Sequence, residues 1–149
     1  MPGEILKVTV DKFTFLVPAG LFFSEAGVWV KLEGGRARLG LSDFAQQNSG
    51  DAVSANIKPV GTTLESGDEF AEIETVKVNV SLPAPVNGTL VEANPSLEDA
   101  AELINQDPYG KGWLAVVDLA DWERDRARLL DAETYAALVK GQAEAELKA

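Results

Sequence analysis

The alternation of apolar and polar residues reverses its phase within EIETVKVNVSL, residues 72 to 82. Ala71 and Ile73 stand at odd positions before the lysine, whereas Val78, Val80 and Leu82 stand at even positions after it. Successive side chains of a β-strand point to opposite faces of the sheet, so one continuous strand keeps a single phase. A two-residue turn at Val76 and Lys77 reverses the phase, because paired positions then sum to a constant. The segment therefore predicts a tight β-hairpin with Lys77 at its tip, projecting into solvent.

This register separates the two faces of the predicted hairpin. One face carries three pairs: Thr75 with Val78, Ile73 with Val80, and Ala71 with Leu82. The other face carries two polar pairs: Glu72 with Ser81, and Glu74 with Asn79. Segregation of this kind fixes the register of a sheet that has one buried face.

The residues of the turn itself are unusual. Type I′ hairpin turns prefer Asn-Gly, and Val76-Lys77 departs from that preference. A turn that ignores local preference is a candidate functional site. The alternative is a turn displaced by one residue, in which Lys77 is an ordinary solvated lysine.

Short strands separated by turn residues fill the first two thirds of the chain. Residues 28–33 alternate and lead into Gly34-Gly35, which predicts a two-residue hairpin. Residues 42–51 open with a Ser-Asp cap pattern and predict a short helix. Between residues 53 and 91 turn residues recur at close spacing, which is typical of a β-sandwich or small barrel. Asn87-Gly88 is the strongest hairpin signal in the chain.

The last third of the chain is mainly helical. Ser96 begins an acidic capping pattern, and apolar residues then recur at helical spacing over residues 97–104. The apolar run at residues 112–119 predicts one more strand. Residues 121–130 predict a helix, and so do residues 131–149, whose first residue is an aspartate cap. We therefore expect a mostly β fold with about three flanking helices.

The length of 149 residues suits one domain with its own core, residues 1–149. No run of residues approaches the roughly 18 apolar positions of a membrane span. The start, MPGEILKVTVDKF, lacks a basic region followed by an apolar core, so it does not resemble a secretory signal. We expect no membrane segment and a cytoplasmic location.

The chain contains neither cysteine nor histidine. This composition excludes disulfides, a thiolate nucleophile, zinc–sulfur sites, and the commonest general base and transition-metal ligand. An enzyme would depend on carboxylates such as Asp118 with Asp121 or Asp43 with Asp51, and no spacing singles these pairs out. We expect no catalytic residue and no metal site. The net charge of −11 disfavours nucleic-acid binding and suits docking onto basic protein partners.

Three stretches together resemble the glycine cleavage system H protein family. VWVKLEGGRARLGLSDFAQQNSGD resembles that family's first strands and helix, and VGTTLESGDEFAEIETVK resembles the stretch that leads to its lipoylated lysine. The tetrapeptide ETVK is similar to the family's E-S-V-K. SLPAPVNGTLVEANPSLEDAAELINQDPYGKGWL resembles the region after the lysine almost motif for motif. The resemblance covers roughly Phe22 to Val139.

The resemblance implies a lipoyl-domain fold, a flattened β-barrel or sandwich known as the barrel-sandwich hybrid. It implies that Lys77 carries covalent lipoic acid and that Glu74 is read by the lipoate-attaching enzyme. It also implies a monomeric, non-catalytic carrier that shuttles an aminomethyl group and electrons. The partners would be a glycine decarboxylase, an aminomethyltransferase and dihydrolipoamide dehydrogenase.

The family's loaded arm can fold back into a cleft on its own domain. Under the resemblance Tyr109, Trp113 and the helix over residues 97–104 are candidates for the lining of that cleft. The alternative is that both aromatic residues belong to the core.

The chain departs from the family's pattern at several positions. Trp29 of an H-x-W motif is present without its histidine, and Val78 stands where the family prefers a small residue. Residues 1–21 form a divergent N-terminal extension, and the C-terminal helix over residues 131–149 is extended. Two other functions stay open. One is an H-like lipoate-binding protein that carries sulfur in a heterodisulfide-reductase-like system, and the other is an unmodified β-domain that only binds a partner.

Overall fold

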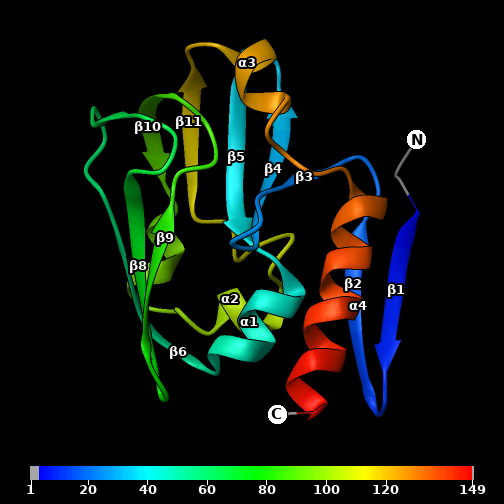
Figure 1. The fold of residues 1–149 in the computed structure, drawn as a ribbon. Coiled ribbons are helices and arrows are strands. Elements are labelled where there is room, and N and C mark those ends of the chain that lie inside the picture. The colour runs from blue at the N-terminus through cyan, green and yellow to red at the C-terminus, as the bar shows by residue number, and fades with distance from the viewer. Residues whose placement is uncertain (1–3, 149) are drawn as a thin grey trace.

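Antiparallel sheets and flanking helices make up residues 4–148, the part of the chain that the computed structural model describes (Figure 1). The largest sheet has six strands in the order β3-β4-β5-β11-β10-β7. Its strands are β3 (Phe22–Phe23), β4 (Val28–Glu33), β5 (Arg36–Leu41), β7 (Thr63–Leu64), β10 (Gly88–Ala93) and β11 (Ala115–Leu119). The β4–β5 hairpin turns at Gly34-Gly35, as the sequence predicts.

A second sheet packs against the first across the main core. It contains β6 (Ala52–Ile57), β8 (Glu69–Thr75) and β9 (Asn79–Pro83) in the order β6-β8-β9. Buried side chains of both sheets meet in one apolar cluster, including Leu39 and Val117 from the large sheet and Phe70, Ile73 and Leu82 from the small one. The predicted lipoyl-type sandwich is confirmed, and within residues 4–148 the sheets do not close into a barrel.

Helices fill the connections and one flank of the sandwich. They are α1 (Asp43–Ser49), the 3₁₀ turn η1 (Pro95–Glu98), α2 (Leu103–Gln106), α3 (Trp122–Arg126) and α4 (Ala132–Lys148). Two predicted caps are confirmed: the Ser42 hydroxyl accepts from the backbone N–H of Ala45, and Asp131 accepts from that of Thr134. No helix among residues 4–148 is long and apolar enough to cross a bilayer.

The first two strands pack against the last helix. Strands β1 (Ile5–Val10) and β2 (Phe13–Pro18) form a separate antiparallel hairpin, and α4 lies beside it (Figure 1). Alternate residues of the hairpin are buried together with one face of α4. This second apolar cluster includes Val8, Val10, Phe15 and Val17 of the hairpin and Tyr135, Val139 and Ala143 of α4. The ring of Tyr135 stacks on Phe23 at 4.4 Å between centroids.

The prediction of one continuous helix capped by Ser96 is wrong, because the element begins one residue earlier, at Pro95, and is divided in two. Its cap is Asn94, whose side-chain oxygen accepts from the Ser96 N–H and whose amide donates to the carbonyls of Lys111 and Trp113. The backbone then runs as a 3₁₀ turn followed by the short α2. Leu97 and other residues of the apolar stripe are still buried, because 3₁₀ and α turns both place residues three or four apart on one side.

The hairpin predicted at Asn87-Gly88 is also wrong. These residues join β9 to β10, which belong to different sheets. Gly88 is needed there because a Cβ would lie 2.1 Å from the backbone oxygen of Asp118 on β11. The glycine therefore serves a close approach between neighbouring strands rather than a tight turn.

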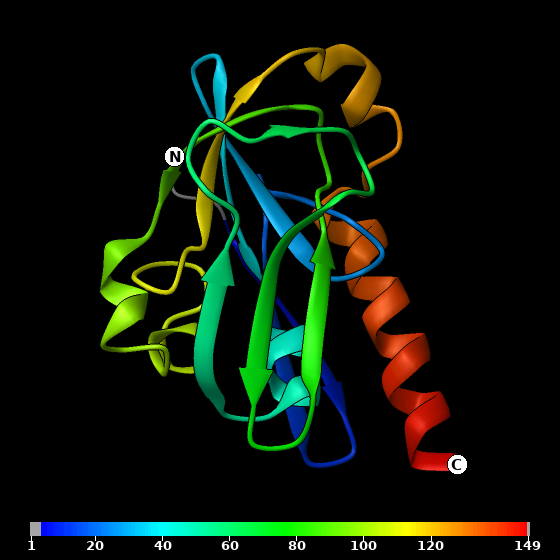
Figure 2. The ribbon, with the colours of Figure 1, turned by 90° about the vertical axis from the view of Figure 1, so that its left-hand side faces the viewer.

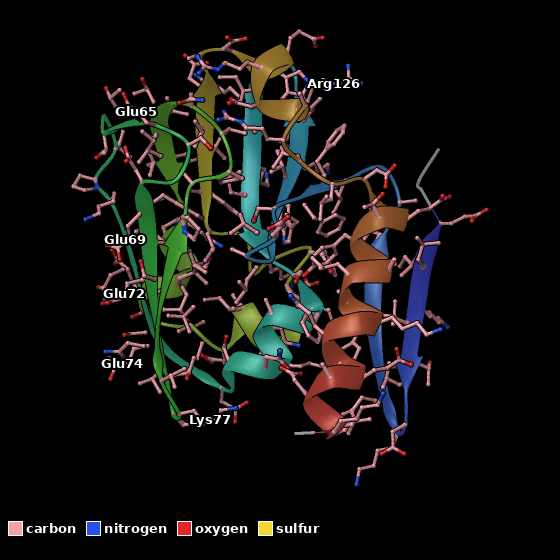
Figure 3. All side chains as sticks on the ribbon, in the orientation of Figure 1. Glu65, Glu69, Glu72, Glu74, Lys77 and Arg126 are labelled. Atoms are coloured by element: carbon pink, nitrogen blue, oxygen red, sulfur yellow. The ribbon has the colours of Figure 1, made fainter. Side chains whose placement is uncertain are left out.

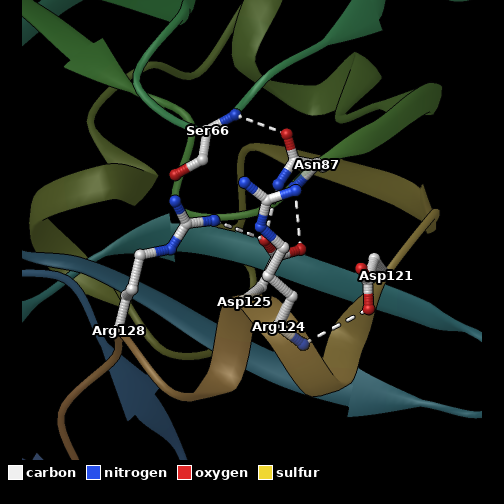
Figure 4. A network of polar contacts seen from close by, with 6 residues as sticks. All are labelled: Ser66, Asn87, Asp121, Arg124, Asp125 and Arg128. Atoms are coloured by element: carbon white, nitrogen blue, oxygen red, sulfur yellow. Dashed lines mark hydrogen bonds and ion pairs between the residues drawn. The ribbon is translucent and has the colours of Figure 1, made fainter.

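Asn87 belongs to a polar network around the fully buried carboxylate of Asp125 in α3 (Figure 4). Asp125 accepts from the backbone N–H of Asn87 at 2.9 Å and from its side-chain amide at 2.6 Å. The Arg128 guanidinium donates to the same carboxylate at 2.9 Å, and the Asn87 oxygen accepts from the Ser66 N–H. The network holds the connection from β9 to β10, which passes from one sheet to the other, against α3.

Replacing Asp125 by Asn should lower the free energy of unfolding by about 2–3 kcal/mol, because an amide group would face the N–H donors of Asn87. Urea unfolding measures this loss. The matched control is Asp118→Asn, since the Asp118 side chain is 60% exposed and lies 3.8 Å from Arg36. The control should change stability by less than about 0.5 kcal/mol. Equal losses in the two variants would contradict the role of the network.

Candidate functional site

The predicted β-hairpin around Lys77 is confirmed in its register. Strands β8 and β9 pair Ala71 with Leu82, Glu72 with Ser81, Ile73 with Val80 and Glu74 with Asn79. Lys77 is exposed at the tip of this hairpin, at one end of the molecule (Figures 1 and 3). The site is therefore built on a strand pair whose other face is anchored in the main core.

The turn at the tip is stabilised by the side chain of Thr75, and it is not the type I′ turn that two-residue hairpins prefer. Within residues 4–148 Asp11 is the one non-glycine residue with positive φ, so Val76 and Lys77 do not form a type I′ turn. The hydroxyl of Thr75 accepts from the N–H groups of Lys77 at 3.2 Å and of Val78 at 3.0 Å. The Thr75 N–H donates to the Val78 carbonyl at 2.8 Å. The Thr75 side chain thus satisfies the turn without a glycine.

The same threonine fastens the tip to the end of α1. Its hydroxyl lies 2.7 Å from the carbonyl oxygen of Ser49, to which it donates, and only 7% of Thr75 is exposed. The N–H of Val76 donates to the Asp51 carbonyl at 3.0 Å. These contacts hold the hairpin tip against the segment between α1 and β6.

The side chain of Lys77 folds back toward α1, although the sequence predicts that it projects into solvent. Its Nζ donates to the carbonyl oxygen of Asn48 at 2.8 Å. Carbonyls in the last turn of a helix have no partner within the helix, so they are ready acceptors. Gly50 has φ 91°, and a Cβ there would lie 3.4 Å from Cδ of Lys77. The positive φ favours glycine at this position, where α1 ends, and the lysine stem lies in ordinary contact with it.

Carboxylates line the strand that leads to the lysine. Figure 3 shows Glu69, Glu72 and Glu74 spaced along β8 toward Lys77. Glu74 is exposed and accepts from the Ser54 hydroxyl at 3.0 Å. The Ser81 hydroxyl, which donates to Glu69, lowers the pKa of that carboxyl. The outer face of the hairpin is therefore an acidic strip, with Lys58 3.5 Å from Glu69 at its far end and Lys77 at the tip.

Two exposed valines flank the lysine. Val76 is 70% exposed and Val78 is 48% exposed. The predicted inward position of Val78 is wrong, because this residue belongs to the turn and lies beyond the last strand pair, Glu74 with Asn79. Lys77 therefore lies between two apolar side chains that are exposed to solvent.

The aromatic residues proposed for a cleft are structural instead. The hydroxyl of Tyr109 donates to the Leu16 carbonyl at 2.7 Å and accepts from the Asp43 N–H, at the opposite end of α1 from Asn48. Burial raises the pKa of Tyr109. Trp113 lies 4.3 Å beneath the Arg38 guanidinium. The structure does not bring these two side chains to Lys77, and both pack against the second apolar cluster.

Trp29 is also part of the core, and its ring lies over Gly40 of the neighbouring strand β5. It is 1% exposed, and its indole N–H donates to the Pro108 carbonyl at 2.9 Å. A Cβ on Gly40, its neighbour on β5, would lie 2.4 Å from the indole ring. The tryptophan therefore has a packing role in this chain.

The candidate carboxylate pairs do not form acid–base pairs. Asp43 is nearly buried at the start of α1, where it accepts from the Leu16 N–H and the Gln46 amide, and Asp51 follows the end of that helix. Asp118 faces Arg36, and Asp121 caps α3. Within the described part of the chain no three Asp or Glu side chains gather as a metal site.

Sequence reasoning missed Thr75, Asn48 and Gly50 as residues that position the lysine. The strand alternation assigns Thr75 only to the inward face of the hairpin. A β-branched hydroxyl residue directly before a turn that lacks glycine is the signal that identifies it. The carbonyl of Asn48 carries no signal in the sequence, because any residue supplies one.

Comparison with known proteins gives a consistent result over most of the chain. The family model described as glycine cleavage H-protein matches residues 21–142. The glycine cleavage system H protein of Brevibacillus brevis is 42% identical over 123 residues, which are 83% of this chain and 97% of that protein. The protein of the same description from Bacteroides fragilis is 44% identical over 122 residues, 82% of this chain and 96% of that one.

A solved structure agrees with these matches. The crystal structure of a glycine cleavage system H protein from Mycobacterium marinum superposes with a TM-score of 0.70 at 30% sequence identity. The match covers 81% of this chain and 97% of that one. The β1–β2 hairpin lies before residue 21, outside the part that the family model matches.

Replacing Thr75 by Val should loosen the hairpin tip, because the N–H groups of Lys77 and Val78 lose their common acceptor. We expect a loss of about 1–2 kcal/mol in the free energy of unfolding, together with faster hydrogen exchange at both amides. Thr75→Ser is the control, since it keeps the hydroxyl and should retain slow exchange. Unchanged exchange in Thr75→Val would show that the hydroxyl does not hold the turn.

Proposed function

Because the chain belongs to the glycine cleavage H-protein family, we propose that it is a lipoyl carrier with its arm attached to Lys77. The observation that supports this proposal most is the position of the lysine. Lys77 is exposed at the tip of a hairpin whose turn is tied to α1 by Thr75. A rigid base with a reachable amine is what a covalent swinging arm requires.

The residues around Lys77 fit an acyl group in amide linkage. Among the ion pairs of residues 4–148 none involves Lys77, so acylation leaves no carboxylate without its partner. Acylation requires the deprotonated amine of Lys77 to attack an activated acyl carbonyl. The amide bond forms as the leaving group departs and the nitrogen loses a further proton. The nitrogen keeps one N–H, which suits continued donation to the Asn48 carbonyl.

The bound lipoyl group supplies a dithiolane, a redox couple that accepts and releases a one-carbon amine fragment together with electrons. The chain itself has no cysteine or histidine for such chemistry. We therefore assign it the role of a non-catalytic carrier. Its own residues position the arm and present it to other enzymes.

Glu74 is proposed as the residue that the lipoate-attaching enzyme reads. Its carboxylate is exposed three residues before the lysine on the polar face of β8. Val76 and Val78 add an exposed apolar contact on either side of the lysine. A charged anchor beside a small apolar patch suits a transient enzyme contact.

The partners proposed for the loaded arm are a glycine decarboxylase, an aminomethyltransferase and dihydrolipoamide dehydrogenase. The relatives reported above are described as glycine cleavage proteins, which supports this set. The net charge of −11 suits weak, electrostatically steered docking by a monomer. The sulfur-carrying alternative receives no support from these relatives.

Intact mass and peptide mapping of the protein from its native host should show one lipoyl amide, located on Lys77. Lys77→Arg should abolish the mass increase, since a guanidinium does not form this amide. An unmodified Lys77 in cells with active lipoylation would contradict the proposal.

Glu74→Gln should slow lipoylation by a purified lipoate-protein ligase about tenfold, the effect of losing roughly 1.4 kcal/mol of charged hydrogen bonding. The matched control is Glu72→Gln, which removes the same charge from the same strand. Equal slowing in both variants would indicate that the enzyme senses only the net charge of the strip. Ligation kinetics followed by intact mass distinguish these outcomes.

A further inference from the structure

A β-bulge interrupts strand β6 next to the tip of the β8–β9 hairpin. The ladder between β6 and β8 pairs Ala52 with Thr75 and then Ser54 with Glu74. Val53 is therefore an extra residue on β6. A bulge disrupts the ladder locally and changes the direction of a side chain. Ala52 packs against the main core, whereas the Val53 side chain lies outside it and 56% of the residue is exposed.

The bulge lies at the same end of the small sheet as the hairpin tip. The N–H of Val76 donates to the carbonyl of Asp51, two residues before Val53, at 3.0 Å. On the other side of the bulge, the Ser54 hydroxyl donates to Glu74 at 3.0 Å. Figure 2, in which this sheet faces the viewer, shows the start of β6 beside the tip of β8–β9. Val53 thus lies between two contacts with the segment that leads to the lysine.

The side chain of Asn105, at α2, holds the backbone of the bulge in place. Its oxygen accepts from the Ala52 N–H at 2.8 Å. Its amide donates to the Gly50 carbonyl at 3.0 Å and to the side-chain oxygen of Gln46 at 2.9 Å. The segment just before Val53 is therefore tied to both α1 and α2. A surface held in this way loses little conformational freedom when a partner binds.

Exposure of a single valine would mean little, because isolated apolar residues are common on protein surfaces. Here three exposed valines surround one carboxylate and one amine. Val53 on β6 joins Val76 and Val78 at the tip, with Glu74 and Lys77 between them in the sequence or the ladder. Apolar side chains with charged groups at their margin are the usual composition of a protein–protein contact.

The kind of partner follows from the chemistry at the lysine. Acylation requires an enzyme to bring an activated carbonyl to within about 3–3.5 Å of Nζ of Lys77. Such an enzyme must cover the side chains around the amine. Enzymes that act on the dithiolane meet the far end of a long flexible arm, so they do not need to cover its base. The three valines therefore fit the attaching enzyme better than the other partners.

We propose that Val53 determines, together with Val76 and Val78, how well the lipoate-attaching enzyme recognises this chain. The inference rests on the proposed lipoylation of Lys77. Glu74 supplies the charged contact, and the bulge extends the recognised surface from the hairpin onto the neighbouring strand β6. The enzyme then recognises two strands held in a fixed arrangement, and not only the linear sequence around the lysine.

Val53→Thr tests the inference, because it replaces one methyl group by a hydroxyl and keeps the β-branched shape. With a purified lipoate–protein ligase, the variant should show a KM for the protein about fivefold higher than that of the unaltered chain, with nearly the same kcat. The matched control is Val60→Thr, which changes a valine that is 62% exposed and follows the other end of β6. The control should leave KM unchanged, and thermal unfolding should show both variants folded.

Two further measurements separate enzyme contact from an effect on the amine. The photo-crosslinking residue p-benzoylphenylalanine in place of Val53 should join the chain to the ligase, whereas the same residue in place of Val60 should not. Acetylation of Lys77 by the N-hydroxysuccinimide ester of acetic acid, followed by peptide mapping, should proceed equally fast in Val53→Thr and the unaltered chain.

An unchanged KM in Val53→Thr, slower chemical acetylation in this variant, or no crosslink from position 53 would overturn the inference. Each of these results is obtained with a chain that the ligase does modify. A ligase that leaves Lys77 of the unaltered chain unmodified would instead contradict the proposed function.

Discussion

The hydroxyl of Thr75 is the contact on which the geometry of the site depends. It supplies the acceptor that two turn amides need, and it binds the tip to the carbonyl of Ser49. A glycine turn would close the hairpin equally well but would lack the hydroxyl that binds the tip to Ser49. The threonine instead couples the hairpin to α1, so the lysine is held relative to the whole sandwich. The side chains of Val76 and Val78 can then stay exposed, because the hydroxyl of Thr75, and not these side chains, stabilises the turn.

The strand alternation in the sequence was sufficient to predict the register and the position of Lys77. One face of β8–β9 packs in the core, and a slip by one residue would turn Ile73 outward, so the pattern has one solution. The same reasoning failed at Asn87-Gly88, because a local turn preference does not reveal which sheet the next strand joins. There the buried Asp125, distant in sequence, decides the path of the backbone.

The contacts of the site could be predicted less well than its place in the fold. The acceptor for Nζ of Lys77 is the backbone carbonyl of Asn48, and since every residue has a carbonyl, the sequence does not identify it. Tyr109 and Trp113 match the family's motifs, but motif membership does not distinguish a cleft wall from a core position. Their hydrogen bond and cation–π contact place them in packing roles. These contacts had to be seen in three dimensions, because Leu16 of β2 lies far from Tyr109 in sequence and Arg38 of β5 lies far from Trp113.

The packing of β1–β2 against α4 also sets an order of events during synthesis. The hairpin is made before α4. At about 5–20 residues per second, roughly 6 to 26 seconds separate the end of β2 from the end of α4. During that interval Val8, Val10 and Phe15 lack their cover, while β8–β9 can already fold against the large sheet strands made so far. A nascent chain therefore completes the hairpin that carries Lys77 before it makes α4, and the apolar face of β1–β2 stays uncovered until α4 is made.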